Sequence, residues 1–447
     1  MVNIDRTFQA RPPRVVALDL LRGMLMVLES IDHAKMFLTT WFGPHETWYE
    51  LKPYSSTALF LIRLATHPCA PGFAFLMGIG IVYFIRSRKG LGWTDRQLVW
   101  HFFVRGLLLV IINMLLTWNW FKREFLGMKV LFISTVLFAL GINFFIGALV
   151  SLLANRFYAY LVRKLTTHSK NGVPLIEVAE RRAAKIRITV LLVLAATFCV
   201  SNVLLMPDGP VLNGRIEGYG EWRYLLYLPG ESNTLFSMYP PMNWFGLSLY
   251  GIAFGYILIK DKRDSKSNAR FNMVLSLAFF FAFLLVRIPG GFGNINPSLL
   301  PPAPPGTLFN NPFLANTQTF FNTIKYAPDL AFSTLFMSVN HFLLALFYLV
   351  PIDSPSAFVQ FIAEGPLLDY GRSSFFFFIV HHLVYLLSSV AIGLWWPGAK
   401  NSEGKVALGY TGFFIVWILG LVIMWRLCRW YAKFKASKGP DSIFRFF

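Results

Sequence analysis

Long apolar runs separated by short polar connections dominate this 447-residue chain. About ten runs extend for roughly 18–29 residues, near the length that a helix needs to cross about 30 Å of hydrocarbon. The pattern predicts an all-α, polytopic integral membrane helix bundle, which we expect to form a single domain over residues 1–447. The expected spans lie at approximately 17–37, 57–85, 98–117, 129–153, 186–206, 238–260, 271–288, 328–350, 373–395 and 409–427.

The polar connections alternate in charge. Most of the 41 Lys and Arg residues fall in every second connection, and basic connections are typically cytoplasmic. This asymmetry predicts that both termini are cytoplasmic and that 155–187 is a basic cytosolic connection. Two Gly- and Pro-rich segments, 207–237 and 289–326, are expected to be long extracytoplasmic loops. The basic 118–129 turn and the 351–371 segment, which has no Lys or Arg, depart from the rule.

Composition supports a membrane protein and disfavours two other classes. The chain is 55% hydrophobic and 14% charged, whereas soluble domains average about 25% charged residues. The net charge of +19 comes from short clusters between spans, so a nucleic-acid partner is not expected. The three cysteines show no CxxC or zinc-ligand spacing, so neither a disulfide framework nor a metal is expected. No cleavable signal peptide is evident.

The first apolar run is unusual because it contains five ionisable residues. A charge at the centre of a bilayer costs roughly 2.5–3.5 kcal/mol on insertion scales, so these groups require partners, a water-filled cavity or a function. At 100° per residue, three of them form one helical stripe that is about 16 Å long. The stripe consists of Arg22, Glu29 and His33, and it is flanked by Asp19 and Asp32.

Two interpretations of this stripe remain open. Asp19 and Arg22, three residues apart, can pair near the inner surface and simply lock helix packing. His33 lies deeper, beside Asp32 and one turn after Glu29. A carboxylate there can orient the imidazole or raise its pKa, as a general base requires.

The second run adds Arg63, His67 and Cys69 around two prolines, which are expected to break or kink the helix. His67 is either a second cavity histidine or a structural one. Cys69 is expected to be a small buried hydrophobe, with an acyl-carrying nucleophile as the alternative.

Late in the chain, Lys325 and Asp329 lie at the mouth of the eighth span, and Asn340 and His341 lie deeper in it. Arg372 precedes the ninth span. It either grips an anionic group entering from the cytosol or only marks the inner membrane surface. His381 and His382 follow within that span.

Several ordered blocks resemble one family. ALDLLRGMLMVLESIDHAKMF, LIRLATHPCAPGFAFLMG, SMYPPMNWFGLSLYGIAFG, NTIKYAPDLAFSTLFM and YGRSSFFFFIVHHL resemble bacterial relatives of heparan-alpha-glucosaminide N-acetyltransferase. That family belongs to a wider group of membrane acyltransferases whose first helix starts with Asp-x-x-Arg-Gly and ends in a histidine. Asp19, Arg22 and Gly23 match this signature, with His33 at a similar distance.

The resemblance implies an acyltransferase that moves an acyl group, usually acetyl, from cytosolic coenzyme A to an extracytoplasmic carbohydrate amine or hydroxyl. The expected partners are acyl-CoA as donor substrate, a glycan or glycolipid acceptor and membrane lipid. The expected location is the bacterial cytoplasmic membrane, as a monomer or a homo-oligomer. The candidate residues are His33, Asp32 and His67 for catalysis; Arg22, Arg372 and Lys325 for the donor; and Asp19, Glu29 and His381 for support.

A proton-coupled transporter is the main alternative, because intramembrane Asp, Glu and His residues also build proton relays. Against it, the sequence shows no inverted repeat with paired broken helices. A catalytically silent scaffold is a third interpretation, and it leaves the buried charges unexplained.

Overall fold

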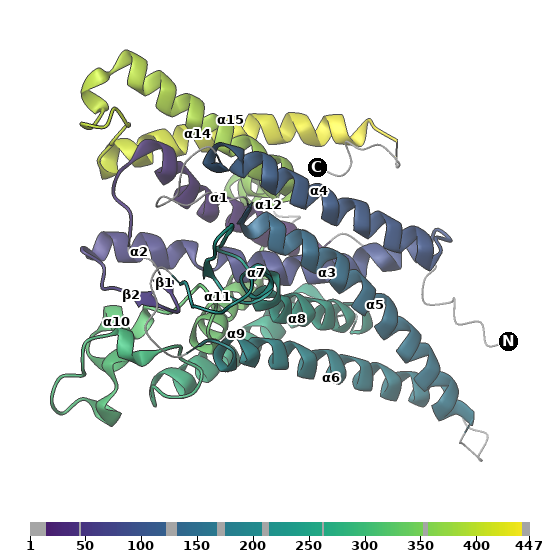
Figure 1. The fold of residues 1–447 in the computed structure, drawn as a ribbon. Helices are drawn as coiled ribbons and strands as arrows, with labels where there is room; N and C mark the ends of the chain where they lie inside the picture. The colour runs from purple at the N-terminus through teal and green to yellow at the C-terminus, as the bar shows by residue number, and fades with distance from the viewer. Residues whose placement is uncertain are drawn as a thin grey trace.

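The computed structural model describes residues 15–43, 46–121, 132–167, 175–207, 214–261, 263–351 and 356–439, and these are mostly helical (Figure 1). The longer helices are α1 (Val16–Leu38), α2 (Thr57–Thr66), α3 (Cys69–Lys89), α4 (Asp95–Phe121), α5 (Val136–Thr167), α6 (Leu175–Leu204), α8 (Pro241–Lys260), α9 (Ser265–Arg287), α11 (Leu330–Leu349), α14 (Ser374–Trp395) and α15 (Tyr410–Ala436). The shorter helices are α7 (Glu221–Leu226), α10 (Thr317–Phe321), α12 (Ala357–Glu364) and α13 (Pro366–Arg372).

Within the described residues, nine helical segments are long and apolar enough to cross a membrane, as expected for an integral multi-pass protein. The α2–α3 pair counts as one of them. Helix α1 has 23 residues, enough for a span, but it is not among the nine because of its ionisable residues. Each expected span overlaps one of these helices.

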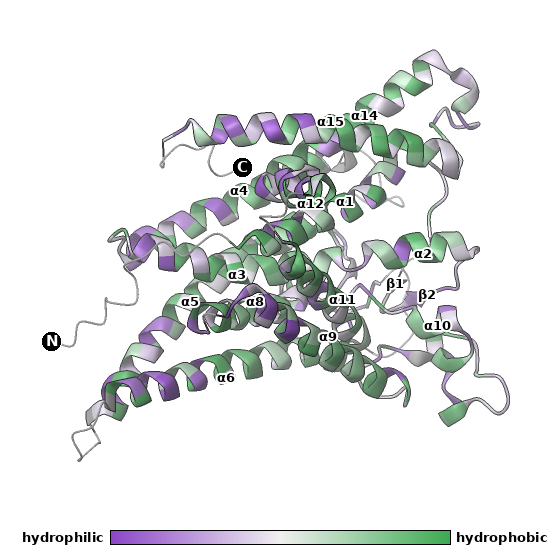
Figure 2. Ribbon diagram, turned by 180° about the vertical axis from the view of Figure 1, so that it is seen from behind, coloured by the Kyte–Doolittle hydropathy of each residue, from purple (hydrophilic) through white to green (hydrophobic). Residues whose placement is uncertain are grey.

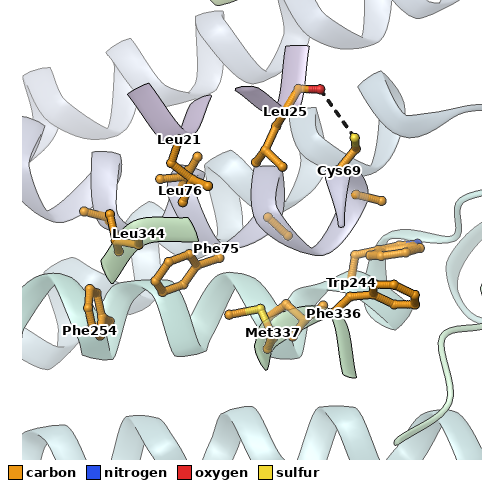
Figure 3. Close-up of a cluster of buried hydrophobic side chains, with 14 of the residues drawn as sticks. Leu21, Leu25, Cys69, Phe75, Leu76, Trp244, Phe254, Phe336, Met337 and Leu344 are labelled. Atoms are coloured by element: carbon orange, nitrogen blue, oxygen red, sulfur yellow. Dashed lines mark hydrogen bonds between the residues drawn. The ribbon is translucent and has the colours of Figure 1, made fainter. Parts of the chain in front are cut away.

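The helices form an interior and a lipid-facing layer. Most residues of α3, α8 and α11 are buried, whereas only about a fifth of the residues in the apolar windows of α4, α6, α9, α14 and α15 are buried. The interior is held by a continuous apolar cluster in which side chains of α1, α3, α8 and α11 interdigitate (Figure 3). Apolar side chains of the outer layer are more than half exposed, as a lipid-facing surface requires; examples are Leu115, Val193, Phe281, Leu387 and Leu419.

The second expected span is broken, as its prolines predict. Helix α2 ends at Thr66 and α3 begins at Cys69, with Pro68 at the junction. The Asn340 side-chain amide of α11 donates a hydrogen bond of 3.0 Å to the Pro68 carbonyl oxygen. The same oxygen accepts the Gly72 N–H at 2.9 Å, so α11 adds a second hydrogen bond to the first turn of α3 and ties the break into the bundle.

Glycines allow three pairs of helices to approach within backbone contact. A Cβ built on Gly23 of α1 would lie 1.9 Å from the Leu367 carbonyl oxygen of α13, and one on Gly371 would lie 1.9 Å from that of Asp19. The same reciprocal arrangement joins α3 to α8 and α4 to α5, through the pairs Gly78–Gly251 and Gly106–Gly141. Small residues at such crossings are the usual basis of tight helix packing in membranes.

The long connections are more ordered than their Gly and Pro content predicts. They carry the hairpin of β1 (Glu46–Thr47) with β2 (Glu50–Leu51), and a three-stranded sheet in the order β3 (Phe132–Ser134), β5 (Leu235–Ser237), β4 (Gly230–Glu231). The 289–326 segment adds α10 and three short 3-10 helices, η2 (Pro297–Leu299), η3 (Leu308–Asn310) and η4 (Pro312–Leu314); a fourth, η5 (Pro397–Ala399), follows α14.

Helix α5 starts later than expected, after β3. It continues to Thr167, and α6 starts at Leu175, so most of the expected 155–187 connection is helical. Hydrophilic residues concentrate at one end of α4, α5, α6 and α15, on the side of the bundle opposite β1, β2 and α10 (Figure 2).

The α1–α13 crossing yields a stability prediction. In Gly371→Ala the new methyl group meets the Asp19 backbone, which cannot rotate away, so the free energy of unfolding should fall by about 1–3 kcal/mol or more. Gly80→Ala in α3 is the matched control: nothing lies within 4 Å of its added Cβ, and helix propensity favours it by about 0.5–1 kcal/mol. Thermal unfolding in one detergent compares the two; equal midpoints would contradict the close crossing.

Candidate functional site

The N-terminal half of α1 is tied to α13. The Arg22 guanidinium donates to Asp19 Oδ1 at 2.7 Å, so the expected pair is confirmed. The same guanidinium lies 3.5 Å from the Gly371 carbonyl oxygen. Arg372, the last residue of α13, is exposed beside this crossing. Two cations from distant parts of the sequence thus gather at one end of α1.

Asp32, in the outer half of α1, belongs to a network that does not include His33. Its carboxylate accepts hydrogen bonds from Arg63 at 2.6 Å and Thr66 at 2.8 Å, and it forms an ion pair with Lys35 at 2.8 Å. Two carboxylates, Asp32 and Glu29, were expected as candidates to orient the His33 imidazole, and the contacts of Asp32 are with Arg63, Thr66 and Lys35 instead. Asp32 points the other way round the helix, where it connects α1 to α2.

Glu46, in β1, is the centre of this network and was not predicted from the sequence. Its side chain is fully buried and accepts hydrogen bonds from Arg63 at 2.8 Å, from His67 Nε2 at 2.8 Å and from the Tyr54 hydroxyl. Burial by itself raises the pKa of Glu46, but Arg63 and His67 outweigh burial and hold this pKa far below its ordinary value. The network joins β1 to α1 and α2.

His67 therefore lies with Glu46 and not with His33. Its ring also stacks on Phe336 of α11, with the ring centroids 5.0 Å apart. Its Nδ1 atom is buried and has no hydrogen-bond partner among the described residues. Among the described residues, the hydrogen bond and ring contacts of His67 are with Glu46 and with phenylalanines, so its position adds no support for a catalytic role.

His33 lies in a cluster of three histidines. Its Nδ1 atom is 2.7 Å from Nε2 of His381, and its ring centroid is 4.4 Å from that of His382. On the other side, its Nε2 atom lies 3.8 Å from Glu29 Oε1. Helices α1 and α14 together build this cluster. His381 and Glu29, the residues expected to support His33, are both its direct neighbours.

Hydrogen bonding fixes which nitrogen of neutral His33 carries the proton. His381 Nδ1 lies 2.7 Å from the Phe377 carbonyl oxygen, which can only accept, so this Nδ1 is protonated. His381 Nε2 is then an acceptor, and His33 Nδ1 must be the donor to it. The lone pair of His33 is thus left on Nε2, which faces Glu29. This is the arrangement of a base whose tautomer is set by a neighbour.

A cavity of about 380 Å³ lies beside α1 and is lined by residues of α1, α3, α4, α5, α13, α14 and α15. Four cations contribute to the lining, namely Arg22, Arg105, Arg372 and Lys435. The apolar part of the lining includes Met26, Phe73, Leu76, Met77, Leu108 and Leu137. Phe378 also lines the cavity, and its ring is 5.6 Å from that of His33 and 5.4 Å from that of His382, although the histidines themselves do not line it.

The cavity explains residues that the sequence analysis did not single out. Arg105 is a cation within the apolar run of α4, and such a residue is by default a candidate functional group. Lys435 lies beyond the expected last span at 409–427, within the part by which α15 exceeds that prediction. Arg105 and Lys435 line the same cavity as Arg22 and Arg372 because α4 and α15 come close to α1 and α13 in the fold.

Lys325 does not line this cavity, contrary to the expectation that it binds the donor. Its backbone N–H donates to the Glu46 carbonyl oxygen at 3.2 Å, which places it at the outer network. Its side chain is 5% exposed, and Nζ lies 5.8 Å from the Tyr239 ring and 5.4 Å from the Tyr326 ring. The neighbouring Asp329 caps α11 by accepting the Phe332 N–H.

Cys69 lies in the apolar cluster of the interior. Its Sγ lies 3.4 Å from the Leu25 carbonyl oxygen, and apolar side chains of α1 and α11 surround the pair (Figure 3). This environment fits the expectation of a small buried hydrophobe, and no base contacts the thiol within the described residues.

No protein-family model matches the chain, and no curated protein matches it. No match supports the resemblance of the sequence blocks to membrane acyltransferases. The evidence on function comes from the geometry of α1 and its partners.

The Glu46 network predicts a pH-dependent stability. Replacing Glu46 by Gln removes one carboxylate from a buried ion pair, which costs about 3–5 kcal/mol at neutral pH. Because the pKa of Glu46 is depressed when folded, its contribution is complete above the ordinary value of 4.5 and declines as the pH falls through the folded value. The gap in unfolding midpoint between wild type and Glu46→Gln should therefore narrow below about pH 4.5.

Glu50→Gln is the matched control, since Glu50 pairs only with the largely exposed Lys52 and should show little effect at any pH. A gap of constant size across the acid range for Glu46→Gln would contradict a buried ionised Glu46.

Proposed function

We propose that this protein transfers an acyl group, most simply acetyl, from coenzyme A on the cytosolic side to an amine or hydroxyl of an extracytoplasmic carbohydrate. The observation that carries the proposal is the cavity, whose lining combines four cationic residues with apolar side chains and includes Phe378, the ring of which lies 5.6 Å from that of His33. The resemblance to membrane acyltransferases gives the same direction of transfer, and it suggests a bacterial cytoplasmic membrane.

The cavity has the chemical polarity of an acyl-CoA molecule. Coenzyme A is polyanionic at its nucleotide end and carries the thioester on a long thin arm. Arg22, Arg105, Arg372 and Lys435 offer charge-assisted hydrogen bonds to phosphates. The apolar walls then suit the arm, and the thioester would lie against Phe378. Because no histidine among the described residues lines the cavity, the Phe378 side chain would have to change rotamer for the thioester to reach His33.

His33 would act as the general base through Nε2. The acceptor N–H or O–H gives its proton to Nε2 while its heteroatom attacks the thioester carbonyl carbon. The C–S bond then breaks, and the leaving thiolate of coenzyme A takes the proton from the imidazolium. Glu29, 3.8 Å from Nε2, stabilises the imidazolium that forms between the two steps.

Access from the outer side is consistent with this role. The His33 side chain retains 18% exposure, so it is not sealed by its neighbours. The outer network of Glu46, Arg63 and Asp32 fixes the surrounding helices, and Lys325 with its two tyrosines lies on the same side. Tyrosine rings and a buried ammonium suit a carbohydrate carrying polar or anionic groups.

The first test concerns the base. His33→Gln should lower the rate of acetyl transfer by about 10²–10⁴-fold because the proton acceptor is lost. The variant should still bind acetyl-CoA, and this binding is measured as thermal stabilisation of the purified protein. The rate is measured with labelled acetyl-CoA and membrane glycans from a strain that lacks the protein.

His341→Gln is the matched control, since His341 is a buried histidine that contacts Tyr250 and Asn272 away from the cavity. Its folded fraction should transfer acetyl at the wild-type rate. Full activity of His33→Gln would remove His33 as the base. If acetyl-CoA neither binds nor stabilises the wild type, and a proton gradient drives uptake of a solute instead, the chain is the proton-coupled transporter.

The second test concerns the donor. Lys435→Gln removes one cation from the cavity mouth, and Lys433→Gln removes an exposed cation two residues away that does not line the cavity. A lost charge-assisted contact of roughly 1.5–3 kcal/mol should raise the dissociation constant of acetyl-CoA about 10–100-fold for Lys435→Gln only. Titration by calorimetry measures both, and equal affinities of the two variants would contradict this donor site.

A further inference from the structure

His33, His381 and His382 form a group that the proposed reaction uses only in part. One nitrogen from each residue lies within 4.8 Å of the others. His382 has no role in the proton transfer described above, yet its ring centroid is 4.2 Å from that of His381 and 4.4 Å from that of His33. Three imidazoles converge on one point between α1 and α14.

Two of these imidazoles already have the tautomer that a metal ligand needs. Nδ1 of His381 and Nδ1 of His382 lie 2.7 Å and 2.8 Å from the carbonyl oxygens of Phe377 and Phe378. A carbonyl can only accept, so both Nδ1 atoms carry protons and both Nε2 atoms carry lone pairs. Metal-ligating histidines almost always donate their other N–H to such a group.

We propose that His33, His381 and His382 bind a transition-metal ion, Zn²⁺ in the first instance, through Nδ1 of His33 and Nε2 of the other two. In this state the His33 proton moves from Nδ1 to Nε2, so the imidazole changes tautomer and no proton is released. Nε2–H then faces Glu29 Oε1, now 3.8 Å away, which supplies the carboxylate–histidine–metal arrangement.

The spacing fits such a site after small side-chain movements. Tetrahedral Zn–N bonds of about 2.0–2.1 Å separate ligating nitrogens by roughly 3.3 Å. That distance lies between the 2.7 Å of the His33–His381 pair and the 4.8 Å limit of the group. Three neutral nitrogen ligands suit Zn²⁺, Co²⁺ or copper and not Mg²⁺ or Ca²⁺, which prefer oxygen. Three protein ligands leave a fourth position for water.

Metal binding has a consequence that depends on the proposed function. With Nδ1 on the metal and a proton on Nε2, His33 has no lone pair for the acceptor. Zn²⁺ should therefore inhibit acyl transfer, and a chelator should restore it.

Binding itself is tested without any activity. The protein is purified without a polyhistidine tag, stripped with chelator and titrated with Co²⁺. Wild type should take up one equivalent and develop the intense visible absorption of tetrahedral Co²⁺, and Zn²⁺ should displace it. His382→Gln and His33→Gln should each weaken binding by more than about 100-fold, since even loss of a group behind a ligand costs about 10–100-fold.

Glu29→Gln should weaken metal binding by about 10–100-fold. His341 is a buried histidine elsewhere in the bundle, so His341→Gln should bind the metal as tightly as wild type does. The proposal is overturned if wild type takes up no metal, or if His382→Gln binds as tightly as wild type. These outcomes leave acyl transfer untouched: metal-free protein that transfers acetyl supports the proposed function alone. Stoichiometric metal binding by a protein that does not bind acetyl-CoA supports the metal site alone.

Discussion

The arrangement of this protein depends on satisfying the ionisable groups of α1 inside an apolar bundle. A lone charge there is costly, so each group needs a partner that the bundle itself supplies. Arg22 is hydrogen-bonded to Asp19 and lies beside a backbone carbonyl of α13. Asp32 accepts hydrogen bonds from Arg63 and Thr66 of α2. His33 is hydrogen-bonded to His381 of α14. Because these partners come from distant parts of the chain, α1 fixes the positions of three other helices. The same pairs place Arg22 in the N-terminal half of α1 and the histidine cluster in its C-terminal half.

The Asp-x-x-Arg-Gly motif has a physical explanation in this structure. Asp19 holds the Arg22 guanidinium beside the cavity mouth, and Gly23 provides the only kind of surface on which α13 can lie in backbone contact. Gly371 does the same from the other helix, which places Arg372 next to Arg22. The motif therefore builds one wall of the proposed donor site through packing as well as through charge.

The fold was largely predictable from the sequence, because apolar runs of membrane length and a proline-broken span follow from hydropathy and backbone chemistry. The candidate site was predictable only where the signal was local. The Asp19–Arg22 pair follows from their spacing of three residues, whereas Glu46 lies in a loop without periodicity and meets Arg63 only through tertiary packing. The same limit explains why the contacts of Asp32 and Lys325 were not predicted. The rotation of about 100° per residue shows which residues share a helix face, but it does not show which neighbouring helix covers that face.

The proposed function requires that the cavity lined by α1, α3, α4, α5, α13, α14 and α15 holds coenzyme A with its acyl end toward His33. The most direct measurement is an experimental structure of the protein in lipid nanodiscs with acetyl-CoA bound. The account predicts that the nucleotide phosphates lie among Arg22, Arg372 and Lys435, and that the thioester lies beside a displaced Phe378, within reach of His33. Coenzyme A bound elsewhere, or in this cavity with the thioester pointing away from α14, would contradict it.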